Sequence, residues 1–248
     1  MTMLKRKLKA VLVKAGIISS PHKNNIAENT NMPMHEGLKR FSNRNLEINT
    51  IVDVGAAQGT WSLNAKNFFP DANYLLFEPL VEREGELDLL CKKNKKFQFI
   101  PKAAGNTNST IHFKISKDLD GSGIANGDEI NEELREIEIV RLDEEVKKHQ
   151  LKGPYLIKLD THGFEVPIIE GCENIINEVN LFIIECYGFH LTKDSLLFAE
   201  MCDLMFTKGF RLFDVVDIMR RPKDEAFWQC DAFFIPKNHL IFEDNNYR

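Results

Sequence analysis

From Asn49 onward, short apolar runs alternate with longer stretches in which apolar residues recur at helical spacing. Short apolar runs without polar alternation are typical of strands that are buried on both faces of a parallel sheet. Their alternation with helices indicates an α/β fold with helices on both faces of the sheet. The predicted parallel strands are 50–54, 73–77, 97–100, 155–159 and 181–184, and the predicted helices are 61–69, 81–94, 165–178 and 196–208.

A different pattern interrupts this alternation after the third strand. Residues 109–116 and 135–141 alternate apolar and polar side chains, which is typical of half-exposed antiparallel strands. This predicts an antiparallel insertion between strands three and four, and inserted segments often cover a substrate site. Two final apolar runs, 210–216 and 227–235, predict a closing pair of strands. The whole pattern predicts a seven-stranded, mostly parallel, Rossmann-like sheet in a domain spanning residues 49–248.

Residues 1–48 are predicted to form a separate N-terminal part. Residues 1–14 carry five basic side chains and no acidic one. One helical face collects the apolar residues Leu4, Leu8, Val11, Leu12 and Ala15. This stretch predicts a basic amphipathic helix that either contacts a membrane surface or a partner through residues 1–16, or packs on the body of the protein. Residues 17–35 show no period and are rich in polar residues, which indicates a linker or cap.

Charge and cysteine content narrow the classes of function. The chain of 248 residues has a formal net charge of −5. Residues 1–14 contribute +5, so the rest of the chain carries −10. Such an acidic body argues against nucleic-acid binding. The five cysteines lack Cys-x-x-Cys spacing, which indicates reduced thiols in a cytoplasmic protein. No apolar run reaches the length of a membrane span. A homo-oligomer remains possible, because the sequence does not determine the oligomeric state.

The first strand leads into the turn Asp53-Val54-Gly55-Ala56-Ala57-Gln58-Gly59. Glycine lets the backbone come close to a ligand, and the helix that follows offers free N–H donors. The Asp53 carboxylate would repel a pyrophosphate but suits an ammonium group, such as that of S-adenosylmethionine. Glu78 ends the second strand, where a carboxylate accepts hydrogen bonds from a ribose diol. This predicts S-adenosylmethionine as the cofactor, held by Asp53, Gly55, Ala56, Gly59 and Glu78, and the alternative is a plain βα turn with incidental acids.

The adenine end of this site is predicted after the third strand, at Ala103-Ala104-Gly105-Asn106. Small side chains let an adenine ring lie flat, and the Asn106 amide is suited to bond the edge of that ring. A simple tight turn accounts for the same residues. Ala103, Ala104 and Asn106 therefore complete the predicted cofactor site.

The fourth strand ends in a second turn, which carries the candidate catalytic groups. Lys158 and Asp160 are two residues apart and point to one side of the strand, with His162 just beyond them. Glu185 ends the next strand. A hydroxyl loses its proton as it attacks a methyl group, so a nearby base helps, and we expect Asp160 first and His162 second in that role. Asp160 as a helix cap is the alternative.

A divalent metal is a further alternative for this turn. Asp160, His162 and Glu185 have the side chains of hard metal ligands. Their spacing matches no known metal motif, so the sequence favours a site without a metal.

The sequence motifs at the ends of these strands resemble those of the FkbM family of S-adenosylmethionine-dependent methyltransferases, over about Asn49 to Lys237. The resemblance is carried by Val52-Asp53-Val54-Gly55-Ala56 with Gly59, Phe77-Glu78-Pro79, Lys158-x-Asp160-x-x-Gly163-x-Glu165 and Ile183-Ile184-Glu185. It implies a class I methyltransferase fold and methyl transfer to a hydroxyl of a sugar, a glycan or a glycosylated metabolite. His162 departs from the acidic residue usual in the family, and Ala57 departs from the glycine common in the wider superfamily.

Two other functions stay open. A nicotinamide-dependent oxidoreductase with a degenerate dinucleotide loop has the same order of elements, although the carboxylate of Asp53 and the missing third glycine weigh against it. A binding domain on a methyltransferase frame would bind the cofactor and transfer nothing.

Overall fold

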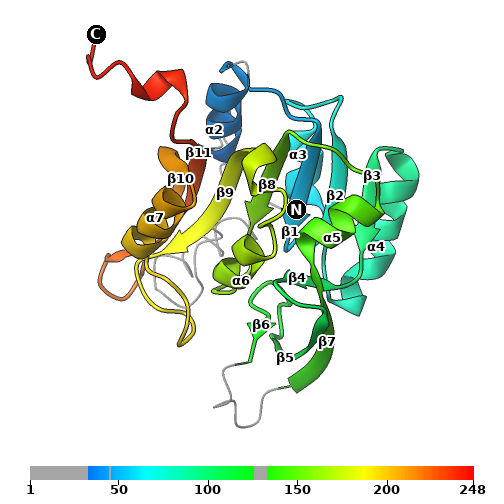
Figure 1. Cartoon of the computed structure of the whole chain (residues 1–248). Coiled ribbons are helices and arrows are strands. Elements are labelled where there is room, and N and C mark those ends of the chain that lie inside the picture. Colours follow the sequence, from blue (N-terminus) through cyan, green and yellow to red (C-terminus); the bar gives the residue numbers. More distant parts are fainter. Residues whose placement is uncertain (1–32, 45, 126–132) are drawn as a thin grey trace, which may run out of the picture. The chain divides into compact units, whose positions relative to one another are not determined.

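The structure is a computed structural model, which describes residues 33–44, 46–125 and 133–248 (Figure 1). The predicted N-terminal basic helix and most of the predicted linker lie outside the described residues. Pro33–Arg248 forms one compact unit. Within the described ranges, every helix is too short or too polar to cross a membrane.

A seven-stranded sheet forms the centre of this unit. Its strands are β1 (Thr50–Val54), β2 (Asn73–Phe77), β3 (Phe97–Ile100), β8 (Tyr155–Leu159), β9 (Val179–Tyr187), β10 (Phe210–Arg220) and β11 (Phe227–Pro236). Their order is β10-β11-β9-β8-β1-β2-β3. From β3 to β9 the strands are parallel, and β11 runs antiparallel to both of its neighbours. The predicted seven-stranded, mostly parallel sheet is confirmed.

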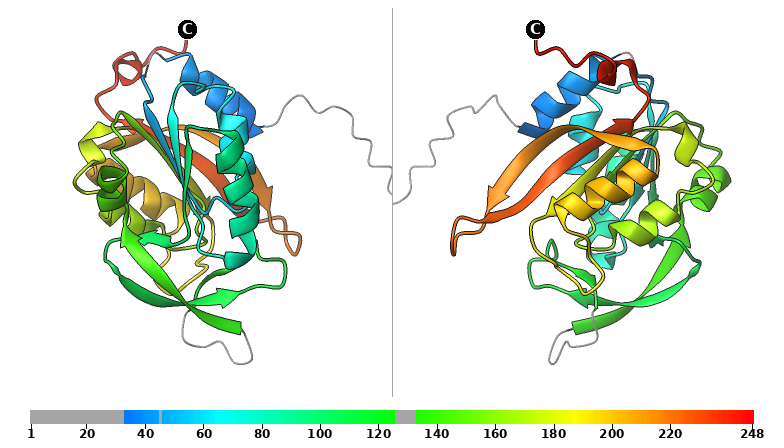
Figure 2. Two further views of the ribbon diagram at one scale, coloured as in Figure 1. Left: turned by 90° about the vertical axis from the view of Figure 1, so that its right-hand side faces the viewer. Right: turned by 60° about the vertical axis from the view of Figure 1, so that its left-hand side comes forward.

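Helices cover both faces of the sheet (Figure 2). The helices α2 (Pro33–Ser42), α3 (Thr60–Ala65) and α4 (Val81–Lys93) lie on one face, and α5 (Leu142–Lys148), α6 (Glu165–Glu170) and α7 (Phe198–Thr207) lie on the other. Two short 3₁₀ helices, Ile176–Glu178 and Leu240–Phe242, complete the described helices. Because both faces are covered, the central strands are mostly apolar, with polar residues such as Thr50 and Asn73 where they begin and a few charged side chains near their carboxyl ends.

Helix α2 begins within the stretch that the sequence assigns to a separate N-terminal part. Its residues Leu38 and Phe41 are buried against the sheet. A Cβ atom added at Gly37 would lie 2.9 Å from the Phe233 ring, so the helix approaches β11 closely. The apolar spacing of Met34, Leu38 and Phe41 is helical, but it is too short to stand out from the polar residues before it.

A second sheet is inserted between β3 and β8. It consists of β4 (Ala103–Gly105), β5 (Ser109–Ile115), β6 (Gly123–Ile124) and β7 (Glu133–Arg141), in the order β4-β7-β5-β6. Strands β5 and β7 are antiparallel, whereas β4 and β7 are parallel. The second sheet lies near the carboxyl ends of the central strands (Figure 1).

Helix α6 is shorter than the predicted helix 165–178, because it ends at Glu170. The next residue, Gly171, packs so tightly on β4 that an added Cβ atom would lie 1.9 Å from the Gly105 carbonyl oxygen. The Gly171 carbonyl accepts a hydrogen bond from the Asp143 N–H at 3.0 Å. The chain therefore turns at Gly171, and the inserted sheet fixes where the helix stops.

Candidate active site

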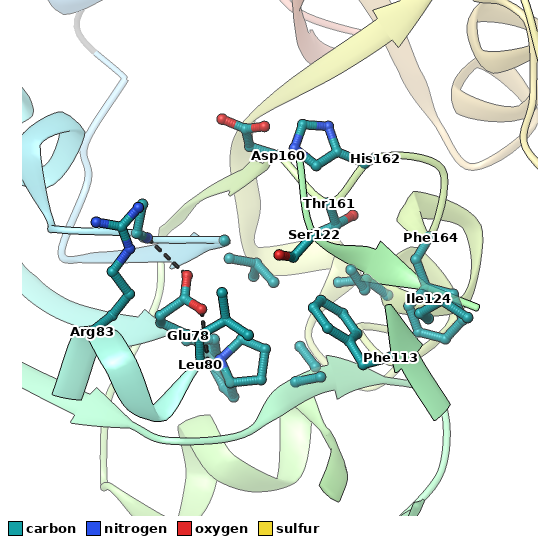
Figure 3. Close-up of a pocket in the computed structure, with 18 of the residues that line it drawn as sticks. Glu78, Leu80, Arg83, Phe113, Ser122, Ile124, Asp160, Thr161, His162 and Phe164 are labelled. Carbon is teal, nitrogen blue, oxygen red and sulfur yellow. Dashed lines mark hydrogen bonds between the residues drawn. The ribbon is translucent and has the colours of Figure 1, made fainter. Parts of the chain in front are cut away.

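A cavity of about 300 Å³ lies where the carboxyl ends of β1, β2 and β8 face the inserted sheet (Figure 3). One part of its wall is apolar and includes Leu80, Phe113, Ile124 and Phe164. The polar part of its wall includes Glu78, Asp160, His162 and Glu185. The cavity thus joins the two turns that the sequence singles out, with the inserted strands as its roof.

The turn after β1 has a conformation that requires glycine. Gly55 has a φ of 77°, and an added Cβ atom would lie 2.0 Å from the carbonyl oxygen of Asp160. Gly55 lines the cavity. Gly59 also has a positive φ, of 76°, but an added Cβ atom there would meet Leu90 of α4 at 2.3 Å. Gly59 and the buried Ala56 therefore shape the turn from outside the cavity lining.

Glu78 is held at the end of β2 by backbone donors. Its Oε2 accepts a hydrogen bond from the Ala57 N–H and its Oε1 accepts one from the Leu80 N–H, both at 2.9 Å. Burial raises the pKa of this carboxyl, against the opposing effects of these two bonds and of Arg83. Each carboxylate oxygen keeps a second lone pair, so Glu78 can still accept hydrogen bonds from two neighbouring hydroxyls.

Asp53 lies beneath the turn and outside the cavity lining, and its direct contact with the cofactor stays a prediction. Its side chain is fully buried, and its Oδ2 accepts a hydrogen bond from the Ser62 hydroxyl at 2.7 Å. The Lys158 ammonium lies 3.4 Å from Asp53 Oδ1 and donates to Asp160 Oδ2 at 3.0 Å. Lys158 is also buried, so Asp53 and Lys158 form a buried charge pair below the cavity, and Asp160 extends this row of charges into the cavity wall.

The opposite charges of Lys158 and Asp160 stabilise the ionised form of each other. Burial opposes the charge on Lys158, but the two carboxylates outweigh it and raise the lysine pKa above its usual value. Burial also opposes the charge on Asp160, yet Lys158 and His162 hold its pKa below the usual range. Asp53 differs, because its complete burial raises its pKa despite Lys158 and Ser62. Near neutral pH, Lys158 and Asp160 are therefore an ion pair.

His162 and Glu185 complete the predicted catalytic group. One atom each of Asp160, His162 and Glu185 lie within 4.8 Å of one another. His162 Nδ1 is 2.9 Å from the Tyr187 hydroxyl and 3.4 Å from Glu185 Oε2. The hydrogen bond to Glu185 raises the pKa of His162 to about 9, so this side chain is a cation at neutral pH.

Most of the atoms that Asp160, His162 and Glu185 would offer to a metal ion already have hydrogen-bond partners. The Glu185 carboxylate accepts hydrogen bonds from the Tyr187 hydroxyl and the Gln229 amide. His162 Nε2 is 2.7 Å from the backbone carbonyl oxygen of Asp120 and donates to it, since that oxygen can only accept. The contacts among the described residues therefore account for this cluster as a network of hydrogen bonds and ion pairs.

The residues of the predicted adenine end lie in two different places. Ala103 and Ala104 line the cavity, but Asn106 is outside the lining. The Asn106 amide donates to Glu170 Oε2 at 2.7 Å, and its carbonyl oxygen accepts from Arg141 at 2.9 Å. The Asn106 side chain therefore ties the end of β4 to α6, and its backbone carbonyl ties it to the end of β7.

Several polar residues of the site are not singled out by the sequence. Asp120 of the inserted segment pairs with the buried Arg83 at 2.5 Å, and its carbonyl oxygen contacts His162. Tyr187 and Gln229 hold Glu185. Asp231 on β11 is the strand partner of Glu185 and is discussed below. The sequence contains one signal for Asp231, since it is an acid inside an apolar strand.

The chain belongs to the FkbM methyltransferase family, because the family model described as "Methyltransferase FkbM domain" matches residues 53–212, more than half of the sequence. Methyltransferase FkbM from Methylobacillus flagellatus KT is similar in structure, with a TM-score of 0.50 and 14% identity over 75% of this chain. This chain covers 43% of that protein, which is less than half its length.

A second solved structure matches with a TM-score of 0.46 and 12% identity, and the match covers 93% of this chain and 89% of that chain. It is 1,6-didemethyltoxoflavin-N1-methyltransferase from Burkholderia thailandensis, with bound 1,6-didemethyltoxoflavin and S-adenosylhomocysteine. Among curated proteins, none matches this sequence.

Proposed function

We propose that the protein transfers a methyl group from S-adenosylmethionine to a hydroxyl of a sugar, a glycan or a glycosylated metabolite. The observation that carries this proposal is the single cavity, which has Glu78 beside an apolar wall at one part and Asp160, His162 and Glu185 at another. A nucleoside fits the first part and a polar acceptor fits the second.

The residues of the cavity suit S-adenosylmethionine. Glu78 retains free lone pairs for the ribose diol, and the small side chains of Ala103 and Ala104 lie beside Phe113 and Phe164 where a flat adenine ring can pack. Gly55 leaves the backbone accessible where the amino-acid part of the cofactor would bind. When bound, the cofactor supplies a methyl group on a positively charged sulfur.

A neutral hydroxyl is the acceptor that the charges of the site favour. Lys158 and His162 are each paired with carboxylates, so neither is free to bind an anionic acceptor. Asp160 and Glu185 accept hydrogen bonds, which suits the several hydroxyls of a sugar. The acidic body of the chain also disfavours a nucleic-acid acceptor. The resemblance of the sequence to the FkbM family supports the same acceptor class.

Ligand-dependent thermal unfolding tests the cofactor assignment. A ligand that binds only the folded state raises the melting temperature. We expect S-adenosylhomocysteine to raise it and NAD to leave it unchanged, and stabilisation by NAD alone would support an oxidoreductase instead. Release of S-adenosylhomocysteine with a panel of methyl glycosides then tests the acceptor class. Cofactor binding without transfer to any member would favour the non-catalytic alternative or another acceptor.

Two further expectations are part of this proposal. The five cysteines are unpaired thiols, which supports a cytoplasmic location. Contact with a membrane surface through residues 1–16 rests on the sequence pattern alone, because these residues lie outside the described ranges.

A further inference from the structure

An unassigned carboxylate, Asp231, lies one strand beyond the cavity-lining Glu185 and is itself outside the lining of the cavity. Asp231 on β11 is the strand partner of Glu185 on β9. Leu159 of β8 pairs with Ile184 of β9, so Asp160 follows at the level of Glu185. Side chains at one level of a sheet point to the same face, so three neighbouring strands each present an acid in one row. Adjacent strands are about 4.8 Å apart, so an acceptor over Glu185 reaches both outer carboxylates.

The packing of the sheet gives no structural reason for this acid. Asp231 follows the buried Cys230 and precedes the buried run Ala232–Ile235. Among the described residues, no donor forms a hydrogen bond with its carboxylate, although Glu185 beside it accepts bonds from Tyr187 and Gln229. Asp231 is half-buried. A carboxylate that is partly withdrawn from water and has no donor destabilises a fold, and such groups persist where they contact a ligand.

The other candidate bases are already committed. Asp160 is ion-paired with Lys158 at 3.0 Å, which makes it a weak proton acceptor. His162 carries a proton that it shares with Glu185 and Tyr187, so it has no free nitrogen lone pair at neutral pH. Glu185 is held by the hydrogen bonds described above. Within the part of the chain that the structure describes, only Asp231 combines a carboxylate free of hydrogen bonds with a position in this row.

We propose that Asp231 is a catalytic residue, the group that accepts the proton of the acceptor hydroxyl, an inference that rests on the proposed function. In the transfer, the acceptor oxygen forms a bond to the methyl carbon while the carbon–sulfur bond breaks. The electron pair of that bond remains on sulfur and yields neutral S-adenosylhomocysteine. The hydroxyl proton passes to the Asp231 carboxylate, which later releases it to water.

The charges around Asp231 suit its proposed role as a base. Burial and the neighbouring Asp160 raise the pKa of Asp231 to about 7, against the opposing effect of Lys158. Glu185 on β9 and Asp217 on β10 add to this increase. A base whose pKa lies near the working pH is ionised often enough to act and basic enough to hold a proton.

Asp231→Asn tests the proposal, with Asp231→Glu as the conservative variant. The control is Asp214→Asn, because Asp214 lies on neighbouring β10 and pairs with Arg40 at 2.6 Å, away from the row. The reaction is S-adenosylhomocysteine release from S-adenosylmethionine with methyl glycosides. We expect Asp231→Asn to lower kcat about 100-fold or more, with an unchanged KM for S-adenosylmethionine and loss of the pH limb near 7. Asp231→Glu should restore part of kcat, and the control should behave as wild type.

A second readout needs no acceptor. Melting temperatures of the free protein are measured between pH 4 and pH 8, and Asp231→Asn should gain stability relative to wild type as the pH rises through about 7. A kcat within twofold of wild type, or a melting-temperature difference that does not vary with pH, would overturn the proposal. Failure of S-adenosylhomocysteine to stabilise the wild type would instead count against the proposed function, and the pH result would still decide whether Asp231 titrates as argued.

Discussion

Lys158 is predicted to be the main electrostatic support of the site, and Lys158→Met removes its charge while keeping an unbranched side chain of similar length. The lysine is 5% exposed and lies between Asp53, which is 0% exposed, and Asp160. Methionine fills the space but offers no donor. The substitution therefore leaves two neighbouring carboxylates without their cation.

The magnitude follows from the burial of the two acids. Removing one partner of a buried ion pair costs about 3–5 kcal/mol, because the remaining charge is left without compensation. The Asp160 side chain is 35% exposed and can recover hydration, whereas Asp53 cannot. We therefore expect a loss near the lower bound, about 3 kcal/mol of unfolding free energy at pH 7. Protonation of Asp53 removes the uncompensated charge, so the loss should fall to about 1 kcal/mol at pH 4.5.

Urea unfolding of wild type and variant at both pH values measures this loss. The matched control is Lys96→Met, which breaks an exposed pair with Asp71 at 3.4 Å and should have little effect at either pH. A loss below about 1 kcal/mol at pH 7, or an equal loss at both pH values, would refute the argument that buried charge dominates here.

Three further predictions follow from the cavity. Glu78→Gln should weaken S-adenosylhomocysteine binding at least about tenfold in calorimetry, because a neutral amide makes weaker hydrogen bonds to the ribose; unchanged affinity would remove Glu78 from the site. Gly55→Ala should destabilise the fold more than Gly209→Ala in urea unfolding, since both have positive φ but only Gly55 places a Cβ atom 2.0 Å from the Asp160 carbonyl; equal losses would contradict the close approach. The pKa of His162 is raised from 6.5 to about 9, so its contribution is complete below pH 6.5 and is lost as the pH rises through 9. His162→Gln should flatten this decline, by up to about 2 kcal/mol for a side chain one-third exposed, and an unchanged pH profile would oppose the assignment.

The sequence predicts the parallel strands well for a physical reason. The bounds of β1, β2, β3 and β8 agree with the predicted ranges, because a strand buried on both faces is a continuous apolar run with a polar residue at its end. The end of α6 is not predictable in this way. It depends on the contact of Gly171 with the inserted sheet, which no local pattern contains.

In the candidate site, too, some residues can be predicted from the sequence and others depend on contacts between distant segments. Asp160 follows β8 directly and Glu185 lies near the carboxyl end of β9, so their meeting at one edge of the sheet can be predicted from the order of elements. Asp120 cannot be found in this way, since it reaches His162 only through the fold of the inserted segment. Asp231 belongs to the row because of the register of β11 against β9, and register between distant strands is not encoded in spacing along the chain.

The pairing of Asp53 with Lys158 also has a consequence for how the chain folds. The two residues are direct partners in β1 and β8, two central strands that are distant in sequence. If β8 slipped by one residue along β1, the ammonium group would turn to the opposite face, among apolar side chains such as Val52 and Ile157. A misaligned chain would thus bury two separated charges, and only the native alignment neutralises them. The charge pair of Asp53 and Lys158 therefore favours the native register of β8 against β1 over a shifted one, whether or not a ligand is bound.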